Sequence, residues 1–170
     1  MNARKAPIVL APSSEFFKIM LEAFERAPDA RVAFTTSGTS MFPMLRDRKD
    51  VVYLRKLEGG AKKYDVVLFR RCSGEYVLHR VVGIEPDGTY VFCGDNQVAL
   101  ERGVKQEQML AVVEAFRRSG ILIDCRRSIL YYCYSRAWPN ARFLRRARLA
   151  VLRRVRWLFG RRRTKIPDKK

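Results

Sequence analysis

The chain has 170 residues, of which 48% are hydrophobic and 31% are charged. This length and apolar content suffice for one buried core, so the composition excludes an intrinsically disordered protein. The formal net charge of +18 is unevenly spread, because residues 117–170 hold 18 Lys and Arg against 2 acidic residues, whereas residues 1–116 hold 17 against 15. The basicity therefore belongs to a C-terminal tail and does not mark the whole chain as a nucleic-acid-binding protein.

Cysteine spacing and hydropathy exclude further classes of protein. The four cysteines form no C-x-x-C pair and have no histidine at ligand spacing, so we expect reduced thiols and neither a zinc site nor a redox dithiol. We expect no metal and no organic cofactor. The apolar stretch 7–12 is shorter than the hydrophobic region of a secretory signal, and no run of about 18 apolar residues predicts a membrane span. We expect a cytoplasmic protein, or one bound peripherally to the inner face of a membrane.

Residues 1–30 predict an N-terminal helical segment. Ser13 and Ser14 can cap a helix, and four apolar residues then recur at helical spacing. These residues are Phe17, Met20, Leu21 and Phe24. One amphipathic helix should therefore run to about Arg26, and Pro28 should end it.

Residues 31–118 predict a domain of short antiparallel strands. Apolar and β-branched segments alternate here with turns that contain glycine. We expect strands at 32–36, 51–54, 65–69, 76–82, 90–92 and 109–113. The dipeptides Ser73-Gly74 and Asp87-Gly88 are typical of hairpin turns, so the expected fold class is mainly β.

Residues 119–170 form the tail, in which helical spacing returns from Ile121. The apolar residues of the expected tail helix form one stripe, made of Leu144, Ala147, Val151, Val155 and Leu158. The other side is rich in arginine, with Arg142, Arg145, Arg146, Arg153 and Arg156. A basic amphipathic helix of this kind fits an anionic membrane surface, which we favour over an acidic protein and over the phosphates of a nucleic acid.

His79 is the only histidine, so any histidine-dependent chemistry must use it. Side chains alternate along its expected strand, which places His79 on one face with Val77 and Val81. Apolar neighbours disfavour the charged imidazole. This environment suits a general base, and it equally suits a half-buried structural histidine.

Ser40 lies in an expected loop whose composition suits substrate binding. Gly38 permits a close approach of the backbone to a substrate, and Pro43 stiffens the loop. Met41 is apolar although the flanks of the segment are polar, as expected beside a bound side chain. Such a loop can hold a nucleophilic serine, and it can also be an ordinary turn.

Several segments, in this order, resemble the boxes of the type I signal peptidase family and of its relatives, the self-cleaving LexA-type repressors. They are Gly38-Thr39-Ser40-Met41-Phe42-Pro43, Asp50-Val51-Val52, Tyr64-Asp65-Val66-Val67-Leu68-Phe69, Leu78-His79-Arg80-Val81-Val82-Gly83 and Gly94-Asp95-Asn96. The resemblance implies a signal-peptidase/LexA-like antiparallel β domain with Ser40 as nucleophile and His79 as base. Most bacterial members carry a lysine at the position of His79, and the endoplasmic-reticulum-type members carry a histidine.

The resemblance leaves the third catalytic group open. Asp95 matches the position of an acid that orients the histidine, and Glu101 can replace an aspartate that histidine-type relatives carry a few residues later. A Ser40–His79 dyad without an acid is the third alternative. Three rival bases stand in turn-like contexts, namely Lys49, Lys62 and Lys63.

The oxyanion of the reaction needs hydrogen-bond donors. Some relatives place a serine hydroxyl two residues before the nucleophile, where this chain has Gly38. We therefore expect the oxyanion to bind backbone N–H groups around Thr39 and Ser40, with Met41 and Pro43 beside the substrate.

These observations predict a serine endopeptidase that cleaves an extended segment of a protein or peptide substrate, as in signal- or leader-peptide processing. The alternative is a LexA-type regulator, or another nucleic-acid-binding protein, whose arginine-rich tail contacts phosphates. One helix before the β domain is too little for a three-helix DNA-reading unit, which favours the peptidase.

Overall fold

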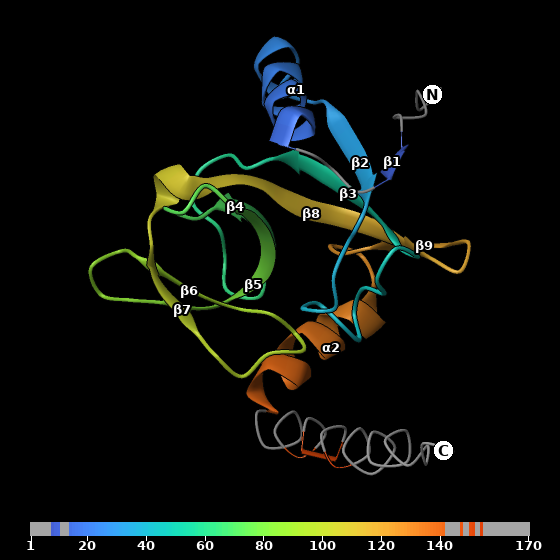
Figure 1. Cartoon of the computed structure of the whole chain (residues 1–170), viewed down its shortest axis with the longest axis vertical. Coiled ribbons are helices and arrows are strands. Elements are labelled where there is room, and N and C mark those ends of the chain that lie inside the picture. The colour runs from blue at the N-terminus through green and yellow to red at the C-terminus, as the bar shows by residue number, and fades with distance from the viewer. Residues whose placement is uncertain (1–7, 11–13, 142–146, 148–149, 152–153, 155–170) are drawn as a thin grey trace, which may run out of the picture.

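Within the described residues, nine strands form one sheet and two α-helices pack beside it (Figure 1). The computed structural model describes residues 8–10, 14–141, 147, 150, 151 and 154. The helices are α1 (Ser14–Arg26) and α2 (Ile129–Asn140), and a 3-10 turn covers Gln106–Gln108. The strands are β1 (Ile8–Leu10), β2 (Arg31–Thr35), β3 (Val51–Lys56), β4 (Val66–Arg70), β5 (Tyr76–Ile84), β6 (Tyr90–Cys93), β7 (Glu101–Val104), β8 (Met109–Arg118) and β9 (Ile121–Asp124).

Strand β8 joins the two halves of the sheet. The strand order is β1-β2-β3-β8-β4-β5-β6-β7, and β9 pairs with β8 beside this path. Strand β1 runs parallel to β2, and the other pairs are antiparallel. The register shifts where β8 meets β3 and where it meets β4. Such bulges increase the local twist of strands, and the sheet curls back on itself in Figure 1.

Alternate side chains of β4 enter two different apolar clusters. Val66 and Leu68 lie in one cluster, against which α1 packs. Val67 and Phe69 point to the opposite face and lie in the second cluster. Both faces of β4 are therefore buried from Val66 to Phe69, which explains why these four residues are all apolar. The α1 residues buried in the first cluster are Phe17, Met20 and Phe24.

The mainly β architecture and the N-terminal helix are confirmed. Helix α1 begins at Ser14 and ends at Arg26, and every expected strand overlaps an observed one. Gly74 and Gly88 have φ of 90° and 81° in the β4–β5 and β5–β6 hairpins, as the turn dipeptides predict. Strands β1 and β7 are additions that the sequence patterns did not indicate.

The prediction that helical structure returns at Ile121 is wrong. Ile121 begins strand β9, which pairs with the end of β8. Ser119 and Gly120 between the two strands have φ of 49° and 85°, and positive φ at both positions is typical of a two-residue hairpin turn. The apolar run in β9 has only three residues, so its periodicity alone could not distinguish a strand from a helix.

The region expected to be a tail therefore contributes a strand and helix α2 to the folded part. The basic amphipathic helix expected around 144–158 lies mostly outside the described residues. None of the helices in the described ranges is long and apolar enough to cross a membrane.

We expect the packing of α1 to contribute substantially to stability. Phe24 is 1% exposed and Ile19, on the same helix, is 60% exposed. Phe24→Ala should lower the free energy of unfolding by about 3–5 kcal/mol, because it removes a fully buried ring. Ile19→Ala should change it by less than about 0.5 kcal/mol. Urea unfolding of the two variants measures the difference, and equal losses would contradict this packing.

Candidate active site

Ser40 lies in the loop between β2 and β3. Met41 and Leu45 are buried and anchor the loop, and the Leu45 N–H donates to the Met41 carbonyl at 2.9 Å. Gly38 has a φ of 98°, a conformation that glycine adopts without strain. Its N–H donates to the Asp47 carboxylate at 2.7 Å. Ser40 itself is half-buried at the loop surface.

Strand β5 carries His79, which is 2% exposed. Its partner across the antiparallel pair with β4 is Val67, and its ring lies near that of Phe69. Burial among these apolar groups lowers the pKa of His79 below its ordinary value, and the nearby Glu101 opposes this effect only in part. The imidazole is therefore neutral near pH 7, as a general base must be.

Glu101, at the start of β7, is the acid beside His79. Its Oε1 lies 2.7 Å from His79 Nδ1, which is within hydrogen-bond distance. His79 Nδ1 nevertheless forms no hydrogen bond of ordinary geometry, and because the imidazole is neutral near pH 7 the contact becomes an ion pair only when the histidine is protonated. Carboxylate contacts in unliganded sites often tighten only when substrate is bound.

Arg71 holds Glu101 in place. Its Nε and Nη2 donate to the two Glu101 oxygens, each at 2.7 Å, and its Nη1 donates to Glu75 at 3.0 Å. Partial burial by itself would raise the pKa of Glu101, but the Arg71 hydrogen bonds and the positive charges of Arg71 and His79 keep it below the ordinary value. Glu101 is therefore an anion fixed beside the imidazole.

Ser40 and His79 line the same cleft, whose volume is about 440 Å³. Arg71 lies on its wall, and most of the other lining is apolar or aromatic. Helix α1 contributes Phe17, which stacks on Tyr76 with ring centroids 4.2 Å apart. The cleft can therefore receive apolar side chains next to the serine and the histidine.

The turn after β6 holds the backbone of the serine loop. The Asn96 N–H donates to the Ser40 carbonyl at 2.7 Å, and Asn96 Nδ2 donates to the Thr39 carbonyl at 3.0 Å. A side chain at Gly94 would bring Cβ to 2.7 Å from the Ser40 carbonyl oxygen. Only glycine fits at this position, which gives the Gly-Asp-Asn sequence a physical role in the site.

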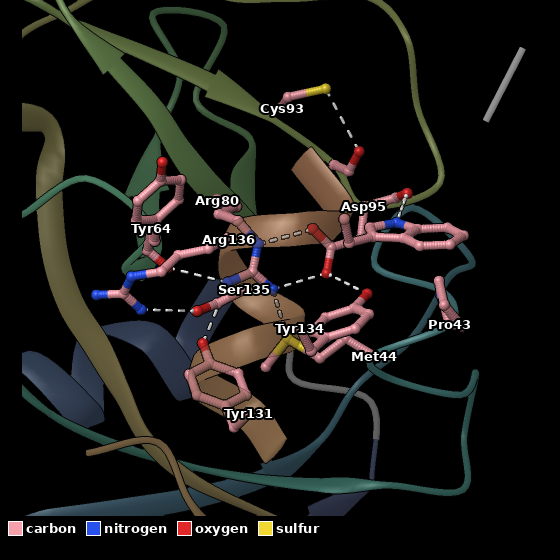
Figure 2. A network of polar contacts seen from close by, with 12 residues as sticks. Pro43, Met44, Tyr64, Arg80, Cys93, Asp95, Tyr131, Tyr134, Ser135 and Arg136 are labelled. Carbon is pink, nitrogen blue, oxygen red and sulfur yellow. Dashed lines mark hydrogen bonds and ion pairs between the residues drawn. The ribbon is translucent and has the colours of Figure 1, made fainter. Parts of the chain in front are cut away.

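The structure places Asp95 against Arg80 and not against His79. The two Asp95 oxygens accept hydrogen bonds from Arg80 Nε at 2.8 Å and from Nη2 at 2.7 Å, and both side chains are buried. Figure 2 shows this pair beside helix α2, with Tyr131 and Tyr134 pointing toward it. Of the two acids that the sequence left open, Glu101 is the one next to the histidine.

Of the residues predicted to bind substrate, some line the cleft and others lie elsewhere. Met41 lines the cleft with Ser40 and His79, whereas Pro43 lines a different groove. Thr39 is exposed and uses its carbonyl to bind Asn96. The three lysines considered as rival bases are Lys49, Lys62 and Lys63. None of them is among the described residues that line the cleft.

Arg71 and Thr36 are two of the polar cleft residues that sequence reasoning missed. Arg71 follows β4 directly, and its local ion pair with Glu75 four residues later was a readable signal. Its pairing with Glu101 joins strands far apart in the sequence, and no local pattern indicates it. Thr36 also lines the cleft, with a buried hydroxyl that has no hydrogen-bond partner among the described residues.

Neither a scan against protein-family models nor a search of curated proteins finds a match for this chain.

The contact between the turn at Gly94 and the serine loop gives a direct test of the site geometry. Gly94→Ala should lower the free energy of unfolding by about 1–3 kcal/mol, since the new methyl group clashes with the Ser40 carbonyl. Gly83→Ala is the matched control, because its Cβ would meet Val91 only at an ordinary 3.6 Å. Thermal or urea unfolding compares the two variants. A Gly94→Ala protein as stable as the control would refute the close approach.

Proposed function

We propose that the chain is a serine endopeptidase of the signal-peptidase-like kind, with Ser40 as the nucleophile and His79 as the general base. The observation that carries the proposal is the cleft that both residues line, with a carboxylate 2.7 Å from Nδ1 of the histidine. A buried neutral base and a fixed acid behind it are what a serine hydroxyl needs to become nucleophilic.

The proposed reaction has two steps. Ser40 Oγ attacks the peptide carbonyl while His79 takes the hydroxyl proton, and the resulting imidazolium then gives this proton to the departing amine. Water, deprotonated by His79, then attacks the acyl-enzyme. As the ester bond to Ser40 breaks, the imidazolium returns the proton to Ser40 Oγ, which releases the carboxylic acid product and restores the neutral histidine. Glu101 would stabilise each imidazolium, and Arg71 would hold Glu101 in place by its paired hydrogen bonds.

The oxyanion donor in this proposal is the Ser40 backbone N–H. This group makes none of the hydrogen bonds found among the described residues, so it remains available for a ligand. The Gly38 N–H is a poorer candidate because it already donates to Asp47. The two hydrogen bonds from Asn96 fix the peptide units around Ser40, and such fixed donors stabilise a developing charge best.

The proposed substrate is an extended segment of a protein or peptide. Apolar rings of Phe17, Phe34 and Tyr76 line the cleft beside Ser40, which suits apolar side chains near the cut. Extended peptides commonly bind such β proteins as an added strand.

Cleavage should depend on Ser40 and His79. Ser40→Ala and His79→Ala should each lower kcat at least about a thousandfold, because each removes one half of the nucleophilic pair. Ser73→Ala changes an exposed hairpin serine and should leave cleavage intact. The measurement compares the new protein N-termini that each purified variant generates in a cell extract. Identical sets of termini from all variants would exclude the proposal.

The pH dependence of kcat/KM should separate the roles of Glu101 and Arg71. In the unaltered protein the acid limb should lie below about pH 6.5, because burial lowers the pKa of His79. Glu101 raises this pKa, so Glu101→Gln should move the limb to lower pH and also reduce kcat. The positive charge of Arg71 lowers the pKa, so Arg71→Gln should move the limb to higher pH.

Arg70→Gln is the control for the pH profiles. Arg70 is the exposed neighbour of Arg71 and lies over the Tyr76 ring. Its replacement should leave the acid limb in place. Shifts of Glu101→Gln and Arg71→Gln in the same direction would contradict the proposed electrostatics.

A further inference from the structure

Helix α2 forms hydrogen bonds to the 94–97 turn, and this turn forms hydrogen bonds to the backbone of the serine loop. Trp138 Nε1 donates to the Asp95 backbone carbonyl at 2.7 Å, and the Tyr134 hydroxyl donates to Asp95 Oδ2 at 2.9 Å. Asp95 is 1% exposed, so both of its acceptors lie away from water. Both the main chain and the side chain of this one residue are therefore fixed from α2.

The next residue along the chain carries this constraint to the nucleophile loop. Asn96 follows Asp95 directly and hydrogen-bonds the carbonyls of Ser40 and Thr39. The Trp138 indole is thus linked to the Ser40 carbonyl through two hydrogen bonds and the one peptide group between Asp95 and Asn96. A short chain of this kind transmits a displacement of the helix to the serine.

The same helix also reaches the strand that carries the base. The Tyr131 hydroxyl accepts a hydrogen bond at 3.2 Å from Arg80, the residue after His79. Arg80 Nη2 also contacts Met44 Sδ at 3.0 Å, on the C-terminal side of the serine loop. The serine loop, strand β5 and helix α2 therefore share one buried anchor, which Figure 2 shows.

The sequence of α2 places its contact residues on the side of the helix that faces Asp95 and Arg80. Its buried residues recur four apart on one side of the helix, namely Tyr131, Ser135 and Pro139, and the partly buried Tyr134 and Trp138 lie beside them. The rings of Tyr134 and Trp138 stack with centroids 6.0 Å apart. Ile129 and Leu130, at the start of the helix, are 78% and 84% exposed. Apolar packing of Tyr131 against Phe116 in the first cluster and the polar contacts to Asp95 and Arg80 together fix the position of α2.

We infer that α2 is part of the catalytic unit, and that Trp138 and Tyr134 are positioning residues that hold the 94–97 turn against the nucleophile loop. The inference rests on the proposed peptidase function for its effect on catalysis. The placement of the turn stands apart from that function and can be measured by itself.

Trp138→Phe and Tyr134→Phe test the inference, because each removes one donor and keeps an aromatic ring. Tyr132→Phe is the matched control, since Tyr132 lies on the exposed side of the same helix. Hydrogen–deuterium exchange of the full chain without substrate should become about tenfold faster in segments 39–45 and 94–97 for the two test variants. The control should exchange at the unaltered rate.

The kinetic part uses a peptide that spans a cleavage site found in the N-terminal screen. Trp138→Phe should lower kcat about ten- to a hundredfold with KM changed less than about twofold, because the serine is displaced rather than the substrate lost. Tyr134→Phe should act in the same direction.

The outcomes separate the two hypotheses. Unchanged exchange in both segments would overturn the inference, and so would faster exchange with an unchanged kcat. If Trp138→Phe does not fold, Tyr134→Phe decides by the same criteria. A chain that cleaves nothing, with faster exchange in the test variants, would reject the peptidase while supporting the positions assigned to Trp138 and Tyr134.

Discussion

The ion pair between Arg80 and Asp95 is the interaction on which the geometry of the cleft depends. Both side chains are fully buried, and a buried charge is tolerated only when its hydrogen-bonding groups find partners. Arg80 meets this condition through Asp95, the Tyr64 carbonyl, the Tyr131 hydroxyl and Met44. These partners come from four separate parts of the chain. The need to satisfy one guanidinium thus brings together the serine loop, strand β5, the 94–97 turn and helix α2.

The alternation of side chains along β5 explains why the site needs two carboxylates. His79 and Arg80 are adjacent in the strand, so their side chains point to opposite faces of the sheet. Asp95 neutralises the buried cation on one face, and Glu101 lies beside the imidazole on the other. A single acid could not contact both groups. The proposed catalytic acid is accordingly a residue whose own position is fixed by a different arginine, Arg71.

Local signals in the sequence predicted much of the fold and only part of the site. Hairpin dipeptides such as Ser73-Gly74 and the amphipathic spacing of α1 act over a few residues, and the structure confirms them. His79 could be predicted because it is the one histidine in the sequence. Ser40 could be predicted because it follows Gly38 closely in an expected loop. The choice between Asp95 and Glu101 could not be made, since it depends on strand pairing across more than twenty residues. The Arg71–Glu101 contact was hidden for the same reason.

The boundary in charge composition is not the boundary of the folded part. Arginines that count toward the basic tail already perform structural tasks: Arg118 donates to the Pro43 carbonyl at 2.8 Å, and Arg117 lies over the Tyr53 ring. Arg136 packs against the ring of Tyr132 within α2. The charge count alone placed these arginines in a separate tail, whereas their contacts show that they belong to the folded domain. Because α2 contacts the buried anchor of the cleft, the first part of the region counted as the basic tail belongs to the folded part of the chain.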